Sequence, residues 1–234
     1  MNRAGAFLLN LLYPNRCGCC KVRIAWDALL CADCLEKLDA LRCTPADWLC
    51  CHKGEEFPWA GVFTVFSYES AARDGILAMK DGAQNFGRYA GSALAEQVRA
   101  AVPPAEIDCV TWVPVSAVRR HRQGYAHAEL LGKSLAEALG RPANGRLLKQ
   151  SDSSLRQHQL SASERAVFGM VFRRTNADLS GQTVLLTDDV LTTGSTMRRC
   201  TELLLEMGAA RVFAAAAACR LRRPREVQPE NEEN

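Results

Sequence analysis

The sequence lacks both a long apolar run and an imbalance of charge. No stretch approaches the roughly 20 apolar residues that cross a bilayer, and the apolar region within Met1–Tyr13 is too short for a secretory signal. We therefore expect a cytoplasmic protein without membrane insertion. The 29 basic and 26 acidic residues leave a net charge of only +3, so overall charge does not by itself indicate a nucleic-acid partner.

Aromatic residues are also scarce. They make up 7% of the chain and are seldom interleaved with basic residues, as they would be in a surface that binds single strands. We expect Trp26 and Trp48 to pack inside the N-terminal region instead. The motif G-x-x-x-x-G-K-[ST] is absent, which excludes a P-loop nucleotide site.

Cysteine, by contrast, is concentrated near the N-terminus. Eight of the 11 cysteines lie in the first 51 residues, among them two C-x-x-C pairs that are separated by ten residues: Cys17, Cys20, Cys31 and Cys34. A turn expected at Asp27 folds the connection into a hairpin and brings the four thiolates to one centre. Four cysteines without an open position suit a structural, tetrahedral Zn²⁺, which supplies folding energy to a region with little core. Disulfides are the alternative.

The other thiols of this region have an irregular spacing. They are Cys43, Cys50 and Cys51, and His52 follows directly. Cys19 offers a further sulfur. This group suits a second zinc site or, alternatively, a set of buried or reactive free thiols.

Composition also suggests how the chain is divided. A length of 234 residues suits one large domain or a medium-sized domain with a small module. The predicted parts are a cysteine-rich zinc-ribbon module at residues 1–58, an α/β domain at 59–220 and a disordered tail at 221–234.

Beyond the cysteine-rich region, β-like and helical patterns alternate, which predicts an α/β fold built on a parallel sheet. Strands are expected at Trp59–Tyr68, Ile107–Val115, Val184–Thr187 and Ala209–Ala218. Helices are expected at Ala71–Lys80, Tyr89–Ala101, Glu129–Leu139 and Met197–Met207. Between them, Leu147–Arg165 is polar and aperiodic, so we expect a long loop that serves as a flap over a ligand or is disordered.

Polar residues follow the apolar run Val184–Thr187, where a strand of the predicted sheet ends. Asp188 and Asp189 come first, and a turn of small residues follows: Thr192, Thr193, Gly194, Ser195 and Thr196. Ligands of open α/β sheets bind at the carboxyl ends of strands. The turn offers backbone N–H groups at the start of a helix, which suits a phosphate, whereas the carboxylates suit ribose hydroxyls or Mg²⁺. Together they predict a ribose 5-phosphate ligand.

A basic stretch follows the strand expected at Ile107–Val115. It contains Arg119, Arg120, His121 and Arg122. Arginine forks bond the oxygens of pyrophosphate in pairs and keep their charge. Its position after a predicted parallel strand favours pyrophosphate binding, and a solvated basic loop is the alternative.

The thirteen residues from Val184 to Thr196 resemble the motif of type I phosphoribosyltransferases that binds 5-phosphoribosyl 1-pyrophosphate (PRPP). With the cysteine-rich start, nearly the whole chain resembles the ComF family. These are bacterial phosphoribosyltransferase-like proteins with an N-terminal zinc ribbon, linked in some bacteria to uptake of transforming DNA. Further segments that carry the resemblance are Leu11–Pro14, Ile76–Lys80 and Leu160–Arg165.

The resemblance implies a type I phosphoribosyltransferase-like fold, a structural Zn²⁺, and PRPP bound with Mg²⁺ by the turn at 192–196. It implies the following catalytic residues: Asp188, Asp189, Arg119 and Arg122. The basic loop of the family ends Arg-Gly-Phe-Asn-Gln, whereas Gln123 and Ala126 stand at the Arg and Asn positions here. The resemblance therefore supports PRPP binding more directly than turnover.

Two functions fit these residues. In the first, the protein transfers phosphoribose from PRPP to a nitrogen nucleophile, which the sequence does not identify. In the second, the PRPP site is a sensor or a relic, and the ribbon and the basic loop bind single-stranded DNA or a protein of the DNA-uptake machinery. The residues do not indicate an oligomeric state.

Overall fold

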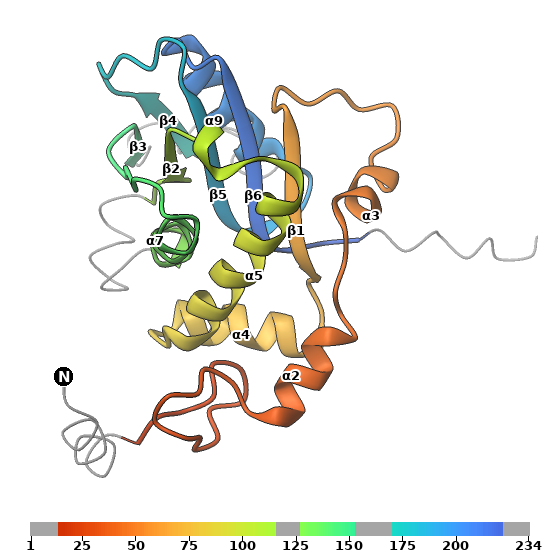
Figure 1. The fold of residues 1–234 in the computed structure, drawn as a ribbon. Helices are drawn as coiled ribbons and strands as arrows, with labels where there is room; N and C mark the ends of the chain where they lie inside the picture. The colour runs from red at the N-terminus through yellow and green to blue at the C-terminus, as the bar shows by residue number, and fades with distance from the viewer. Residues whose placement is uncertain (1–13, 116–126, 153–169, 222–234) are drawn as a thin grey trace, which may run out of the picture.

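The computed structural model describes residues 14–115, 127–152 and 170–221, which form a parallel sheet with helices on both faces (Figure 1). The strand order is β1-β6-β5-β2, and each neighbouring pair is parallel. This confirms the predicted α/β fold. No helix in these ranges is long and apolar enough to cross a membrane. The strands are β1 Gly61–Ser67, β2 Cys109–Trp112, β5 Thr183–Leu191 and β6 Arg211–Cys219.

The two faces of the sheet bury separate cores, because successive residues of a strand point to opposite sides. Leu185 of β5 belongs to the core that α5 and α7 cover, whereas Val184 and Leu186 belong to the core that α9 covers. The helices are α4 Ser70–Lys80, α5 Asn85–Ala101, the short 3-10 helix η1 Pro104–Glu106, α7 His127–Leu139 and α9 Ser195–Glu206.

The strand that carries the acid pair is longer than predicted. The prediction ended it at Thr187, but the ladder between β5 and β6 continues from Asp188 to Leu191. The prediction was wrong because it followed the apolar run, whereas backbone pairing with β6 holds the polar residues in the strand as well. Both carboxylates are therefore attached to the rigid sheet rather than to the turn.

A separate two-stranded sheet consists of β3 (Leu148–Asp152) and the antiparallel β4 (Met170–Arg174). Phe172 of β4 is buried in the core beneath α9. The prediction of a loop over Leu147–Arg165 was thus wrong for β3, because this short polar strand is stabilised by a partner that is distant in sequence. Residues 153–165 lie outside the described part of the chain.

The first cysteine-rich stretch packs against α4 and α5, in the lower part of Figure 1. It contains the predicted turn at Asp27 and then α2, Ala32–Asp39. At Gly18, an added Cβ would lie 2.4 Å from the backbone nitrogen of Phe86 in α5, so no larger residue fits there without movement. Asn85 Nδ2 also donates to the carbonyl of Arg16 at 2.8 Å. The stretch is therefore docked closely on the helical layer.

The chain then runs to the edge of the parallel sheet, where α3 (Pro45–Cys50) lies beside β1 (Figure 1). The N–H of Cys43 donates to the carbonyl of Val65 at 2.9 Å, and the N–H of Ser67 donates to the carbonyl of Leu41 at 2.8 Å. These bonds satisfy backbone groups on the outer edge of β1. The domain boundary at residue 58 and the disordered tail stay predictions.

Candidate functional site

A pocket of about 230 Å³ lies where β2 and β5 approach their carboxyl ends. Such a position is the usual ligand site of an open α/β sheet. Five elements supply its polar lining: Lys80, His127, Gln150, Asp188, Asp189 and Thr196. The pocket therefore unites the predicted acid pair with one residue of the predicted phosphate turn.

The two carboxylates are oriented by the backbone that follows them. Asp188 Oδ1 accepts from the N–H of Asp189, and Asp189 Oδ1 accepts from the N–H of Val190, both at 2.8 Å. Burial and the neighbouring Asp189 carboxylate raise the pKa of Asp188. The pair is thus an electrostatically costly arrangement that a cation or hydroxyl donors from a ligand would stabilise.

Lys80 is a site residue that the sequence analysis did not select. It is the last residue of α4, and its Nζ lies 2.8 Å from Asp189 Oδ2. The signal was present in the resemblance of Ile76–Lys80 to a Leu-Lys helix end. Lys80 brings a positive charge into the pocket beside the acid pair, where an anionic ligand group can also reach it.

His127 is a second residue that the sequence analysis missed as a site residue. It is the first residue of α7, is buried and lines the pocket. It stands where the loop of the ComF family ends in Gln, so the departure was visible in the sequence. Arg119 and Arg122, together with the departures at Gln123 and Ala126, lie outside the described residues.

The turn of small residues leads into α9 as predicted. Gly194 has φ +76° and precedes the first helical residue, Ser195. The Oγ1 of Thr193 donates to the Oγ of Ser195 at 3.2 Å, and Thr192, Thr193 and Ser195 are exposed. The turn thus presents hydroxyls and the N-terminal end of a helix next to the pocket, although Thr196 is the member that lines it.

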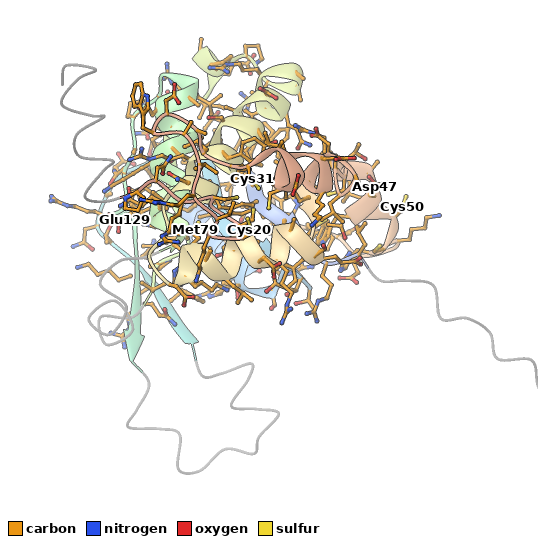
Figure 2. All side chains as sticks on the ribbon, turned by 90° about the horizontal axis from the view of Figure 1, so that it is seen from below. Cys20, Cys31, Asp47, Cys50, Met79 and Glu129 are labelled. Carbon is orange, nitrogen blue, oxygen red and sulfur yellow. The ribbon has the colours of Figure 1, made fainter. Side chains whose placement is uncertain are left out.

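The four predicted zinc ligands form one cluster. The Sγ atoms of Cys17, Cys20, Cys31 and Cys34 all lie within 4.8 Å of one another, and Cys20 and Cys31, which Figure 2 shows close together, have their Sγ atoms 3.7 Å apart. Ligands 2.3 Å from a tetrahedral zinc would be about 3.8 Å apart. The sulfur atoms therefore fit a zinc ion.

The backbone around the first cysteine pair also suits a metal-bound thiolate. The N–H groups of Cys19 and Cys31 donate to Cys17 Sγ at 3.5 and 3.4 Å. Burial by itself would raise the pKa of Cys17, but these donors lower it to about 7. The thiolate, which a lower pKa favours, is the form that binds metal. Burial raises the pKa of Cys19 to about 12, so Cys19 remains a thiol at neutral pH.

The second group of thiols does not assemble around one centre. Cys43 Sγ lies 3.5 Å from Cys219 Sγ at the end of β6, whereas Cys50 is exposed on α3, away from Cys20 and Cys31 in Figure 2. His52 stacks on Trp48. In the described ranges, the cysteine and histidine side chains placed closely enough for a metal are those of the first four-cysteine cluster.

The two N-terminal tryptophans have different surroundings. Trp26 is 39% exposed, so the prediction that it packs inside the ribbon was wrong. Trp48 is fully buried, which confirms that it packs, but its indole Nε1 donates to the carbonyl of Thr192 at 3.1 Å. It thus contacts the predicted phosphate turn, which the sequence analysis did not foresee.

Comparison with known proteins provides independent evidence on the class of this protein. Residues 135–232 match the phosphoribosyl transferase domain family. The chain is 33% identical over 105 residues to the DNA utilization protein YhgH of Salmonella typhi, which covers 45% of this chain and 46% of that protein. It is 32% identical over 98 residues to the competence protein ComFC of Bacillus subtilis, which covers 42% of this chain and 38% of that protein. The matches thus span less than half of either relative.

A similar solved structure is the glutamine PRPP amidotransferase of Bacillus subtilis complexed with ADP and GMP. Its sequence identity is 27% and its TM-score 0.41, over 61% of this chain and 27% of that chain.

The parallel sheet, the acid pair at its carboxyl edge and the domain match define a protein with a type I phosphoribosyltransferase-like domain. Over less than half of its length, the chain is similar to the DNA utilization protein YhgH and the competence protein ComFC. Its N-terminal four-cysteine cluster is consistent with a zinc ribbon.

Proposed function

We propose that the pocket binds PRPP together with Mg²⁺ and that the protein is a phosphoribosyltransferase. The observation that carries the proposal is the convergence of an acid pair, a lysine and the turn at a helix N-terminus. PRPP has vicinal hydroxyls on a ribose with a phosphate at one end and a pyrophosphate at the other. The site offers groups of matching charge and hydrogen-bonding character for each of these parts.

In this proposal the turn at 192–196 holds the 5-phosphate with backbone N–H groups and hydroxyls. Asp188 and Asp189 accept hydrogen bonds from the ribose hydroxyls. Lys80 offers its charge to the pyrophosphate, and so do Arg119 and Arg122. Bound with PRPP, Mg²⁺ supplies positive charge that stabilises the departing pyrophosphate, and the oxygens of the acid pair suit it as ligands.

The proposed reaction is a displacement at ribose C1. The bond from C1 to the pyrophosphate oxygen breaks, pyrophosphate leaves with the electron pair, and an acceptor nitrogen bonds to C1 and loses a proton. The carboxylates favour the positive charge that develops on the ribose ring. Gln150 and Phe172 are paired across β3 and β4 and both line the pocket. They would offer the acceptor an amide and an aromatic ring.

Titration calorimetry with PRPP and MgCl₂ tests the binding part of this proposal. We expect binding by the wild-type protein and its loss in the double variant Asp188→Ala/Asp189→Ala. The variant Asp108→Ala, at a carboxylate beside the start of β5 that bonds the N–H of Thr183, is the matched control and should bind as wild type. Absence of binding by the wild type would rule out the proposal. Release of pyrophosphate on addition of a panel of nitrogen bases then distinguishes a transferase from a sensor.

For the four-cysteine cluster we propose a structural zinc ion. Cys17, Cys20, Cys31 and Cys34 are the ligands that the geometry supports. A bound zinc holds the two pairs together and thereby orders the stretch that packs on α4 and α5.

A second candidate function is the binding of single-stranded DNA by the ribbon. One observation favours it: Trp26 is exposed, as is Val22, in a stretch that also presents Lys21 and Arg23. An exposed indole can stack on a base while basic residues contact phosphates. The affinity for a labelled oligonucleotide should fall steeply with salt and drop in Trp26→Ala. An affinity that changes with neither would count against this function.

A further inference from the structure

Three aromatic rings from the N-terminal region lie directly behind the phosphate turn. A Cβ added at Gly194 would meet the rings of Trp59, Phe57 and Trp48 at 3.0, 3.3 and 3.5 Å. Trp48 and Trp59 are buried, so water has little access to this side of the turn. Because Gly194 also has φ +76°, a conformation that suits glycine, the rings and the turn fit each other closely.

One of these rings also makes a directed bond to the turn. The Nε1–H of Trp48 donates to the carbonyl oxygen of Thr192 at 3.1 Å. The carbonyl of Thr192 and the N–H of Thr193 belong to one planar trans peptide, in which they point in opposite directions. A bond that holds the carbonyl toward Trp48 therefore holds the N–H of Thr193 toward the other side, away from the rings.

Trp48 is itself held in place by the short helix α3. Thr44 and Asp47 form a capping box at its start, with the N–H of Thr44 bonded to Asp47 Oδ2 at 2.7 Å. His52 stacks on the indole with ring centroids 4.2 Å apart, and its Nδ1 donates to the carbonyl of Trp48 at 3.0 Å. Cys43, the residue before Thr44, donates its N–H to the carbonyl of Val65 in β1. The position of the indole is thus set by the sheet on which the acid pair also lies.

We propose that Trp48 is a positioning residue for the phosphate turn, which keeps the N–H of Thr193 directed at the 5-phosphate of the ligand. The inference rests on the proposed function, and it adds a role for a residue 144 positions away from the turn. A turn that is already ordered loses less conformational entropy on binding. Loss of the indole bond therefore weakens binding of a ribose phosphate without removing any group that touches it.

The variant Trp48→Phe tests this inference, because phenylalanine keeps an aromatic ring but has no donor. Its affinity for ribose 5-phosphate, measured by calorimetry, should fall about two- to tenfold, the range expected for one hydrogen bond. Its affinity for pyrophosphate with MgCl₂ should stay within twofold of wild type. Leu49→Ala is the matched control, since Leu49 is the next residue of α3 and is 44% exposed. It should bind both ligands as wild type.

A second measurement uses the wild-type protein, so it does not depend on how well the variant folds. The ¹⁵N-labelled chain has four tryptophan indole signals, and the Trp48 signal is assigned sequentially. It should shift on titration with ribose 5-phosphate, whereas that of Trp26 should not. Three results would each overturn this inference but leave the proposed function standing. They are an unshifted Trp48 signal at saturation, an unchanged affinity in Trp48→Phe, and an equal loss of affinity for both ligands. Failure of the wild type to bind ribose 5-phosphate and PRPP would overturn the proposed function as well.

Discussion

Replacement of Lys80 by methionine removes a positive charge beside the acid pair and keeps most of the side-chain volume. The Nζ of Lys80 lies 2.8 Å from Asp189 Oδ2, and the two side chains are 35% and 15% exposed. By Coulomb's law, the attraction between two such charges is about 1.5 kcal/mol in water and about 6 kcal/mol at an effective dielectric constant of 20. Desolvation and lost side-chain entropy oppose this attraction, and fully exposed pairs retain only about 0.2–1 kcal/mol. We expect a coupling of about 1–2 kcal/mol for this half-buried pair.

A double-mutant cycle with Lys80→Met and Asp189→Asn measures the coupling by urea unfolding. The protein should be free of PRPP and Mg²⁺, because a bound cation would compensate for the lost lysine. The pair of Lys21 and Asp81 is the control, since its atoms are 3.4 Å apart and its side chains are 55% and 70% exposed. Its coupling should stay below about 0.5 kcal/mol. A coupling for Lys80 and Asp189 no larger than that of the control would refute the reasoning.

Three further predictions concern the zinc ligands, the turn and the acid pair. Metal analysis should find one zinc ion per chain in the wild type and less in Cys17→Ser, and an unchanged content in that variant would contradict the ligand set. Gly194→Ala places a Cβ 3.0 Å from Trp59 at φ +76°, and should destabilise the fold by about 1–3 kcal/mol; an unchanged melting temperature would show that the rings yield easily. Burial and Asp189 raise the pKa of Asp188, so the folded state loses stability as the pH rises from the unfolded pKa of about 3.9 through the folded pKa. Asp188→Asn should therefore raise the melting temperature at pH 7 but not at pH 3. The rise should be about 2–4 °C for each kcal/mol gained in the free energy of unfolding. An equal rise at both pH values would contradict this cause.

The turn at residues 192–196 and the cysteine pairs could be predicted from the sequence because their geometry is local. Asp188 and Asp189 follow a buried strand directly, and Gly194 precedes a helix, so a dozen residues determine how the groups are arranged. The cysteines of each C-x-x-C pair are likewise brought together by a single turn of chain. The structure places all four thiols together, as the spacing predicted.

The residues that sequence reasoning missed are those that enter the site from distant elements. Lys80 reaches Asp189 from the end of α4, and His127 enters from the start of α7. Only the family resemblance marks their positions. A lysine at a helix C-terminus is common for electrostatic reasons alone, so the helical pattern does not distinguish Lys80 as a site residue. β3 was missed for a related reason, because its pairing with β4 rather than its own apolar content stabilises it as a strand.

The N-terminal region contacts two elements next to the candidate site. These contacts help to decide whether the region is an appended DNA-binding module or a part of the site. The ribbon packs on α4 and α5, and its Lys21 pairs with Asp81, the residue after Lys80. From α3, the indole of Trp48 donates to the carbonyl of Thr192 in the proposed phosphate turn, residues 192–196. A module that served DNA alone would need no contact with the turn. The two attachments therefore favour a linked system. We expect removal of the proposed zinc ion to disturb the Lys80 end of the site first, because the cysteine cluster lies in the stretch docked on α4 and α5.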